Sequence, residues 1–197
     1  MSPATKIWGP GTSDLTEFQG RFYYLLHPRP TIVLITLCPD GKINAMPASW
    51  NTPVSEEPPT IAVAVDKESY THRCLQHHPE ATINIPPAEL VDKVYALGTV
   101  SGEEVDKVSK HGLELQPSET VKPPTWAEAI GVIEAKVIKA IDIGEVTLYI
   151  FQALKTKARK GTHTRYGWDF RKTNILLHNA GRAFYKVGKL ILAKKKP

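Results

Sequence analysis

The chain has 197 residues, of which 42% are hydrophobic and 23% charged, a balance typical of a soluble globular protein with one domain over residues 1–197. It has no run of about 18 apolar residues, and its N-terminus has neither the basic start nor the apolar stretch of a signal peptide, so we expect no membrane span and a cytoplasmic location. The net charge of +5 is modest, and the basic runs 155–160 and 194–196 are more typical of a solvated face and a basic C-terminal tail than of a nucleic-acid surface, so nucleic-acid binding is a disfavoured alternative.

The cysteines and the paired histidines predict no metal site. Cys38 and Cys74 lie in no CxxC or metal-finger spacing and cannot form a disulfide framework, so we expect two small buried hydrophobic residues. His77 and His78 would point about 100° apart on a helix, which is a poor way to hold one metal ion, so we expect a solvated helix end.

The first quarter of the chain predicts a short N-terminal extension, one helix and a hairpin. Residues 14–26 have apolar side chains near helical spacing, with Ser13 or Asp14 as a candidate N-cap, and the prolines of 27–30 must end that helix. Residues 31–37 (TIVLITL) form a strand, 39–42 (PDGK) a turn, and 43–50 a returning strand.

The middle of the chain alternates strands with short helices. A corner at 56–59 (EEPP) precedes a strand at 60–65, a helix at 71–78 and a strand at 81–86. Helical spacing returns at 88–97 and again at 103–112, where Gly112 is a natural C-terminal stop.

The second half predicts mainly β structure. Residues 130–141 and 144–154 alternate strongly and would form a hairpin linked by 142–143, and the strands 175–178, 183–187 and 189–193 finish the chain. Strands that pair with their sequence neighbours suit a closed or partly closed antiparallel barrel. The long alternating helices of a doubly wound fold are missing.

The common nucleotide and hydrolase motifs GxGxxG, GxxxxGK[ST], HExxH and GxSxG are absent from the sequence. A nucleotide-dependent enzyme of the common folds is therefore disfavoured.

The segment 44–55 (NAMPASWNTPVS) is too polar for a core and too ordered for a linker. Along a strand, Asn44, Met46, Ala48 and Trp50 would face one side, and Pro47 requires an edge or a bulge. Free backbone groups there could meet a planar heterocycle, helped by four polar side chains and bordered by Trp50; the polar residues are Ser49, Asn51, Thr52 and Ser55. The alternative is a proline-rich corner whose polar side chains satisfy their own backbone.

A second polar cluster follows the strand 60–65. Lys67, Ser69 and Thr71 offer a cation and two hydroxyls just before a short helix, an arrangement that favours a phosphate. The alternative is an ordinary helix cap with a solvated lysine. A ring site and a phosphate site on adjoining strands together indicate a mononucleotide cofactor.

The order of these segments resembles the flavin reductase-like FMN-binding family, in its flavoredoxin and archaeal ferric-reductase branch. The residues that carry the resemblance are HPRPTIVLIT, DGKINAMPASWNTPVSEEPPTIAVAV, SYT and ATINIP, followed by 88–115 and LLHNAGRAFYKVGK. It covers roughly residues 22–190, and the block 28–65 is its specific part.

The resemblance implies a mainly β fold with short helices, a six-stranded antiparallel Greek-key split β-barrel, and a homodimer with FMN near the subunit interface. It implies an oxidoreductase that passes reducing equivalents from NAD(P)H through FMN to a flavin, a ferric complex or a protein acceptor. The ring would be held by Asn44, Ala45, Met46, Ser49, Trp50, Asn51, Thr52, Val54 and Ser55. The phosphate would be held by Lys67, Ser69, Tyr70 and Thr71.

One departure from the family concerns the hairpin 142–151. Many flavin reductases have a Gly-Asp-His element there, and its histidine has no counterpart in this chain. His178 and Tyr185 are candidate substitutes near the flavin, with packing roles as the alternative. The missing histidine leaves open a non-enzymatic FMN-binding electron carrier or flavin-storage protein.

Overall fold

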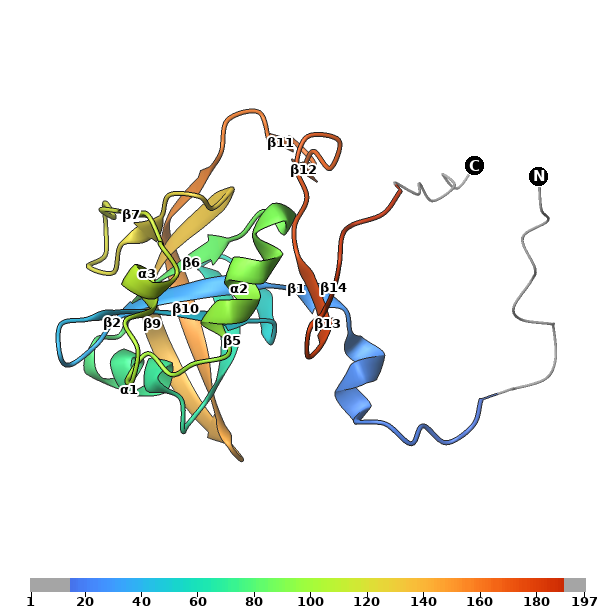
Figure 1. Ribbon diagram of the computed structural model, residues 1–197, viewed down its shortest axis with the longest axis horizontal. Coiled ribbons are helices and arrows are strands. Elements are labelled where there is room, and N and C mark those ends of the chain that lie inside the picture. Colours follow the sequence, from blue (N-terminus) through green and yellow to red (C-terminus); the bar gives the residue numbers. More distant parts are fainter. Residues whose placement is uncertain (1–14, 190–197) are drawn as a thin grey trace.

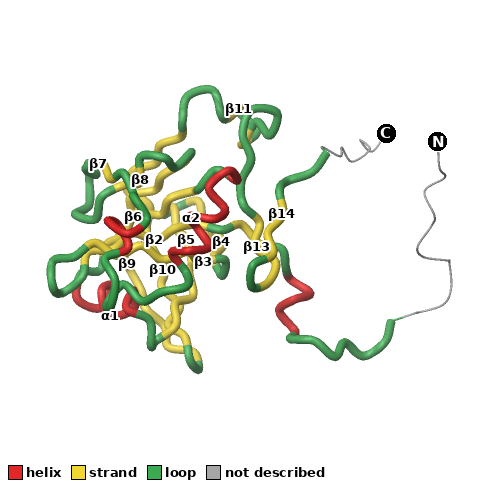
Figure 2. The backbone as a smooth tube through the Cα atoms, in the orientation of Figure 1, coloured by secondary structure: helices red, strands yellow, loops and turns green. Residues whose placement is uncertain are grey.

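A computed structural model describes residues 15–189, so the candidate caps Ser13 and Asp14 and the expected strand residues 190–193 lie outside the described part of the chain. Strands dominate and the helices are short, which confirms the predicted fold class (Figure 2). The helices are η1 (Phe22–Leu26), α1 (Tyr70–His77), η2 (Ala88–Leu90), α2 (Val91–Leu97) and α3 (Lys107–Lys110). None of the helices within 15–189 is long and apolar enough to cross a membrane.

The main sheet has seven strands, where the resemblance implied six. Their spatial order is β3-β2-β6-β9-β10-β5-β4, and every neighbouring pair is antiparallel. Their bounds are β2 (Ile32–Leu37), β3 (Ile43–Ala48), β4 (Asn51–Glu56), β5 (Pro59–Asp66), β6 (Glu80–Ile85), β9 (Gly131–Ile143) and β10 (Val146–Ala158). Short strands outside this sheet are β1 (Arg29–Pro30), β7 (Leu115–Gln116), β8 (Thr125–Trp126), β11 (His163–Thr164), β12 (Gly167–Trp168), β13 (Leu177–Ala180) and β14 (Ala183–Tyr185).

The two edges of the main sheet are forced together by the chain itself. β3 and β4 lie at opposite edges, yet only Ser49 and Trp50 separate them in the sequence. That link spans at most about 11 Å, whereas the edges of a flat seven-stranded sheet would lie about 29 Å apart. The sheet therefore curls into a barrel that is split between β3 and β4.

Apolar residues cover both faces of β2, so the barrel has an inner and an outer core. The inner cluster fills the barrel, and Met46 and Ala48 of β3 pack against it. The outer cluster holds Ala45 on the opposite face of β3, together with residues of α2 and the 113–129 region. The predicted alternation along β3 is therefore correct.

An arm projects from the barrel at one end (Figure 1). It consists of η1 with the preceding residues 15–21, and beside it β1, β13 and β14 form a separate three-stranded sheet. The predicted helix 14–26 is wrong over residues 15–21, where the chain has no helix, and residues 22–26 form a 3₁₀-helix none of whose residues is buried. An amphipathic stretch with no core to cover has little to stabilise it as an α-helix.

Two further predictions of element bounds need correction. The β9–β10 turn lies at Gly144 and Glu145, two residues beyond the expected link, because Gly144 adopts the positive φ of +54° that this tight turn requires. The predicted helix 103–112 shortens to α3, although Gly112 does follow it with a φ of +57°.

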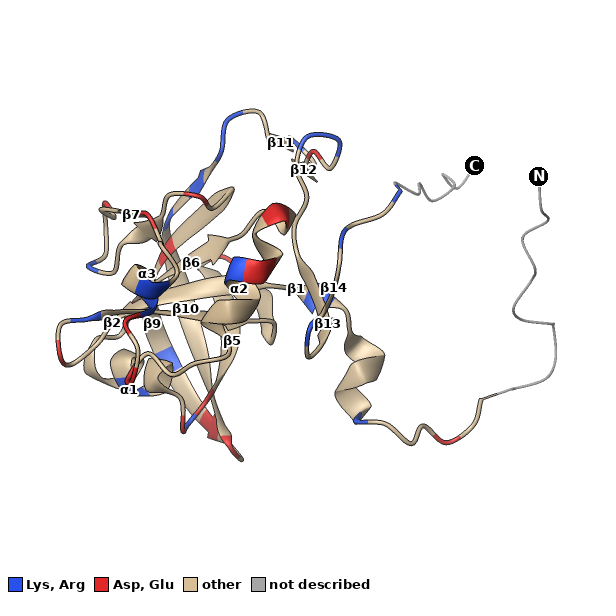
Figure 3. Ribbon diagram, in the orientation of Figure 1, with Lys and Arg blue, Asp and Glu red and all other residues tan. Residues whose placement is uncertain are grey.

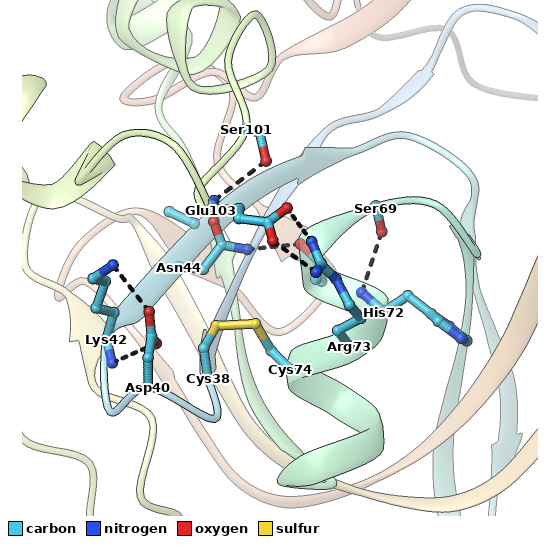
Figure 4. Close-up of a disulfide and its surroundings, with 12 residues drawn as sticks. Cys38, Asp40, Lys42, Asn44, Ser69, His72, Arg73, Cys74, Ser101 and Glu103 are labelled. Carbon is cyan, nitrogen blue, oxygen red and sulfur yellow. Dashed lines mark hydrogen bonds and ion pairs between the residues drawn. A yellow bond between two sulfur atoms is a disulfide. The ribbon is translucent and has the colours of Figure 1, made fainter.

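The expectation of two free cysteines is also wrong, because Cys38 and Cys74 form a disulfide (Figure 4). Cys38 directly follows β2, and Cys74 lies on α1, which packs against β2 and β3. Both residues are buried as expected. Their 36-residue separation left no spacing pattern, so only the packing of α1 brings them together.

Candidate functional site

A cavity of about 350 Å³ lies between β3 and the start of α1, and we call it the β3–α1 cavity. It brings together residues from both polar clusters of the sequence: Asn44 and Met46 from the first, and Ser69, Tyr70 and Thr71 from the second. Its other lining residues are Pro47, Glu68, Gly98, Val100, Ser101, Gly102 and Lys107.

Asn44 joins the two clusters directly. Its side chain is buried, and its Nδ2 donates a hydrogen bond to Thr71 Oγ1 at 2.8 Å (Figure 4). Its Oδ1 is buried without a hydrogen-bond partner within residues 15–189. Gly102 packs so closely on Asn44 that a Cβ at this position would lie 2.0 Å from Oδ1, so a side chain there would displace Asn44.

Ser69 caps α1, as the alternative interpretation of the second cluster proposed. Its Oγ accepts a hydrogen bond from His72 N at 3.2 Å and donates one to Asp66 O at 2.7 Å. Capping does not remove it from the cavity, because Ser69, Tyr70 and Thr71 all line the wall at the α1 N-terminus.

Lys67 is the member of the second cluster that turns elsewhere. Its Nζ donates to Gly144 O at 2.9 Å and lies 3.9 Å from a carboxylate oxygen of Asp142, at the tip of the β9–β10 hairpin. The side chain that does supply a cation to the β3–α1 cavity is Lys107, which lies outside both polar clusters of the sequence. A lone lysine in a short polar helix gives no sign of burial in the sequence, so only the packing reveals it.

Lys107 is buried at the cavity wall. Its Nζ donates to Leu97 O at 2.7 Å and to Ala45 O at 3.1 Å, so it joins the end of α2 to β3. Loss of hydration on burial lowers the pKa of Lys107 from 10.5 to about 8.

A second cavity of about 290 Å³ adjoins the first along β3, and we call it the β3–β13 cavity. Pro47 and Gly98 line both cavities. Its remaining lining residues are Thr31, Ala48, Ser49, Val94, Tyr95, His178, Gly181 and Phe184. Of the two candidate substitutes for the family histidine, His178 lines this cavity, with Nδ1 3.2 Å from Ser49 Oγ, whereas Tyr185 is exposed on β14.

Together the two cavities follow β3 from Asn44 to Ser49, a length of about 17 Å at the usual rise of a strand. The polar end lies at α1 and Lys107, and the more apolar end lies at Ala48, Tyr95 and Phe184.

The rest of the segment 44–55 faces a different direction. Trp50, Asn51 and Thr52 line a third cavity of about 240 Å³, together with residues of η1. The guanidinium of Arg29 donates to Ser49 O at 3.1 Å and to Asn51 O at 2.6 Å, so these carbonyls are already bonded within the chain. Val54 and Ser55 are exposed on β4. The structure thus divides the expected ring site between two sides of the β3–β4 link.

Within residues 15–189, no group of three or more histidine, cysteine, aspartate or glutamate side chains could hold a metal ion. His77 is exposed, while His78 is half-buried and its Nε2 lies 2.8 Å from Glu80 Oε2.

Known proteins share both the sequence pattern and the fold. An uncharacterised protein of Pyrococcus abyssi is 33% identical over 160 residues, which cover 79% of this chain and 88% of that protein. The ferric-chelate reductase (NAD(P)H) of Archaeoglobus fulgidus is 28% identical over 108 residues, which cover 54% of this chain and 63% of that protein. The flavoredoxin structure of Desulfovibrio vulgaris (Miyazaki F) superposes with a TM-score of 0.77 at 28% identity, covering 93% of this chain and 97% of that chain.

A more distant structure shows the fold alone: nitrilotriacetate monooxygenase component B from Bacillus cereus has a TM-score of 0.83 at 19% identity, with 93% of this chain and all of that chain (100%) covered. The family model described as "Flavin reductase like domain" matches residues 24–185. This match spans all of the main sheet and both cavities along β3, and the chain belongs to the flavin reductase-like domain family.

Proposed function

We propose that this protein is an FMN-dependent oxidoreductase that passes reducing equivalents from NAD(P)H to a flavin, a ferric complex or a protein acceptor. The observation that carries the proposal is the pair of adjoining cavities along β3, polar at one end and apolar at the other. FMN has the same polarity along its length, with a phosphate at one end, a hydroxylated chain in the middle and a planar ring at the other.

The residues present fit this group. At the polar end, Ser69 and Thr71 lie at the positive end of the α1 dipole. The unpartnered Oδ1 of Asn44 can accept a hydrogen bond from a ligand hydroxyl, which would satisfy a buried oxygen that has no partner within the described residues. At the other end, Pro47, Ala48 and Phe184 give apolar walls for a ring.

When bound, FMN supplies hydride acceptance and electron transfer, while the chain binds and orients it. Ser49 and His178 form the polar pair at the ring end, where His178 Nε2 also lies 3.2 Å from Gly181 O. This pair can donate or accept a hydrogen bond at the ring end of the cavity, a role that a histidine of the β9–β10 hairpin would otherwise fill.

The site assignment predicts that Ser69→Ala/Thr71→Ala weakens FMN binding about tenfold or more, because hydrogen bonds to a charged group are the strong ones. Fluorescence titration of the apoprotein with FMN measures the dissociation constant. The affinity of the double variant for riboflavin, which lacks the phosphate, should differ little from that of the wild type. The matched control is Thr164→Ala, which removes an exposed hydroxyl group elsewhere. Unchanged FMN affinity in the double variant would contradict the assignment.

Enzymatic activity is tested by anaerobic stopped-flow mixing of the FMN-loaded protein with NADH and with NADPH. Loss of flavin absorbance with either donor supports the reductase. The absence of a histidine from the hairpin 142–151 favours a second candidate, an FMN-binding electron carrier or storage protein. No loss of absorbance with either donor would rule out the reductase and leave this candidate.

We also propose that the protein is a homodimer. The arm carries large apolar side chains that nothing in the described part of the chain covers, among them Phe22, Leu25 and Leu26. Exposed apolar groups gathered on one element are typical of a surface between subunits.

A further inference from the structure

The Cys38–Cys74 disulfide joins the elements that form two walls of the β3–α1 cavity (Figure 4). Cys38 opens the turn that leads into β3, and its N–H group donates to Lys42 O at 2.9 Å. Asn44 of the β3 wall follows Lys42 closely. Cys74 lies one turn beyond Thr71 on α1, so both side chains face the same side of the helix. The disulfide therefore constrains the separation of β3 from the N-terminus of α1.

Besides the disulfide, α1 is held by packing and by polar contacts of modest strength. Leu75 packs in the inner cluster, and His72 Nδ1 lies 2.9 Å from the hydroxyl oxygen of Tyr149. The ion pair of Arg73 with Glu103 is solvated, with side chains 46% and 54% exposed, and such pairs add little to stability. An isolated helix of 8 residues is marginal in water, so the position of α1 depends on these contacts and on the disulfide.

A ligand in this cavity depends on the separation of its walls. Ser69, Tyr70 and Thr71 at the start of α1 line one wall, and Asn44 and Met46 of β3 line another. Hydrogen bonds tolerate only a narrow range of donor–acceptor distances, so a displacement of α1 by about 1 Å would break those that a ligand makes to one wall. The hydrogen bond between Asn44 and Thr71 would be lost with them.

The sulfur atoms themselves are shielded from reductants by the fold. Cys38 is 2% exposed and Cys74 is 0% exposed. A thiolate must reach one of the two sulfur atoms to open the bond, which requires α1 to move away from the sheet. A ligand that contacts both β3 and α1 opposes the same movement. The disulfide should therefore strengthen ligand binding, and the ligand should protect the disulfide, because such coupling is reciprocal.

We propose that the Cys38–Cys74 disulfide is a redox switch for FMN affinity, in which the disulfide form binds FMN tightly and the dithiol form binds it weakly. The reaction is thiol–disulfide exchange: an external dithiol supplies two electrons and two protons, becomes a disulfide itself, and leaves Cys38 and Cys74 as thiols. The inference rests on the proposed FMN site and names how that site is regulated.

The experiment titrates FMN into the disulfide wild type, into wild type refolded in dithiothreitol and freed of it without air, and into Cys38→Ser/Cys74→Ser. A thiol count in denaturant distinguishes the two wild-type forms. The control for a general loss of stability is Ile83→Val, because Ile83 is a buried residue of the inner cluster that lines neither cavity along β3. We expect the reduced wild type and the double variant to bind FMN about fivefold or more weakly than the disulfide form, and Ile83→Val to bind it equally well.

The reciprocal effect gives a second measurement. Each tenfold difference in FMN affinity between the two forms should make the disulfide harder to reduce by about 30 mV when FMN is bound. Redox buffers of dithiothreitol, with and without FMN, followed by thiol counts, measure this shift.

Equal FMN affinity of the disulfide and dithiol forms, or an equal loss of affinity in Ile83→Val, would overturn the inference. If the reduced wild type or the serine variant does not fold, Cys38→Ala/Cys74→Ala carries the same expectations. Failure of the proposed function would appear differently, as a disulfide wild type that does not bind FMN.

Discussion

Burial distinguishes Lys107 from the neighbouring Lys110 and changes the pKa of its ammonium group. Lysines 107 and 110 lie on the same four-residue helix, yet one is buried and the other is exposed. Loss of hydration disfavours the charged form of Lys107 and lowers its pKa to about 8. The buried ammonium group of Lys107 therefore makes the FMN-free protein less stable, and a bound anion would stabilise its charged form.

The pKa of Lys107 predicts a dependence of stability on pH in the FMN-free protein. Its folded-state pKa of about 8 lies below its ordinary value of 10.5, so between these values the unfolded chain holds a proton that the folded chain has released. Stability relative to Lys107→Met should therefore rise from pH 8 to pH 10.5, by about 3 kcal/mol in total.

Urea unfolding of the two proteins at several pH values measures this difference. Lys110→Met should show no such rise relative to the wild type, because Lys110 is exposed in the folded protein. A difference between wild type and Lys107→Met that stays constant with pH would contradict the prediction.

The disulfide ties α1, whose N-terminus lines the β3–α1 cavity, to the end of β2. Cys38 follows β2, which pairs with the strand that carries Asn44, and Cys74 lies one turn beyond Thr71 on α1 (Figure 4). The hydrogen bond from Asn44 to Thr71 joins α1 to β3, the neighbour of β2 in the sheet. α1 is thus held against the sheet by a covalent and a polar contact at its first two turns.

Closing a loop of this size should stabilise the protein substantially. Cys38 and Cys74 are 36 residues apart, for which the loss of unfolded-chain entropy corresponds to about 4 kcal/mol. We expect dithiothreitol to lower the denaturant midpoint of the wild type. The midpoint of Cys38→Ser/Cys74→Ser should be the same with and without the reductant. A wild-type midpoint that dithiothreitol does not change would contradict the prediction.

The molecule as a whole consists of a split barrel and an arm with contrasting surfaces. Charged residues are distributed over the barrel, whereas η1 (FYYLL) has none (Figure 3). Phe22, Leu25 and Leu26 are 73%, 68% and 62% exposed. Burying such side chains contributes about 1.5–3 kcal/mol each, so a second copy that covers them would gain substantially.

The proposed dimer predicts that Leu25→Asp/Leu26→Asp produces a monomer. Light scattering coupled to size-exclusion chromatography should give a dimer mass for the wild type and a monomer mass for the double variant. Tyr166→Asp removes a large, even more exposed aromatic side chain from the β11–β12 hairpin and should stay dimeric. A monomeric wild type would contradict the dimer, and a dimeric double variant would show that the arm is not its interface.

Local patterns were sufficient for most element types. The strands predicted at 31–37, 60–65 and 81–86 and the helix at 71–78 match β2, β5, β6 and α1 within two residues at each end. Alternation, β-branched residues and punctuation by proline and glycine act over a few residues, so the sequence displays them directly. For the same reason Pro47 correctly indicated an edge strand, since a residue without an N–H group is tolerated there.

The predictions that were wrong concern features that depend on which segments are neighbours in space. The helix expected at 14–26 had the right spacing but no surface to cover, and the two cysteines had no pattern but became neighbours when α1 packed on the sheet. The sequence by itself determined the strands of the barrel and the polar stretches on β3 and before α1, because these features depend on residues that are close together in the sequence. Only the tertiary structure decided which of those residues share a cavity, that Trp50–Thr52 turn away from it, and that Lys107 is buried in its wall, because burial and proximity arise when the sheet curls and distant segments meet.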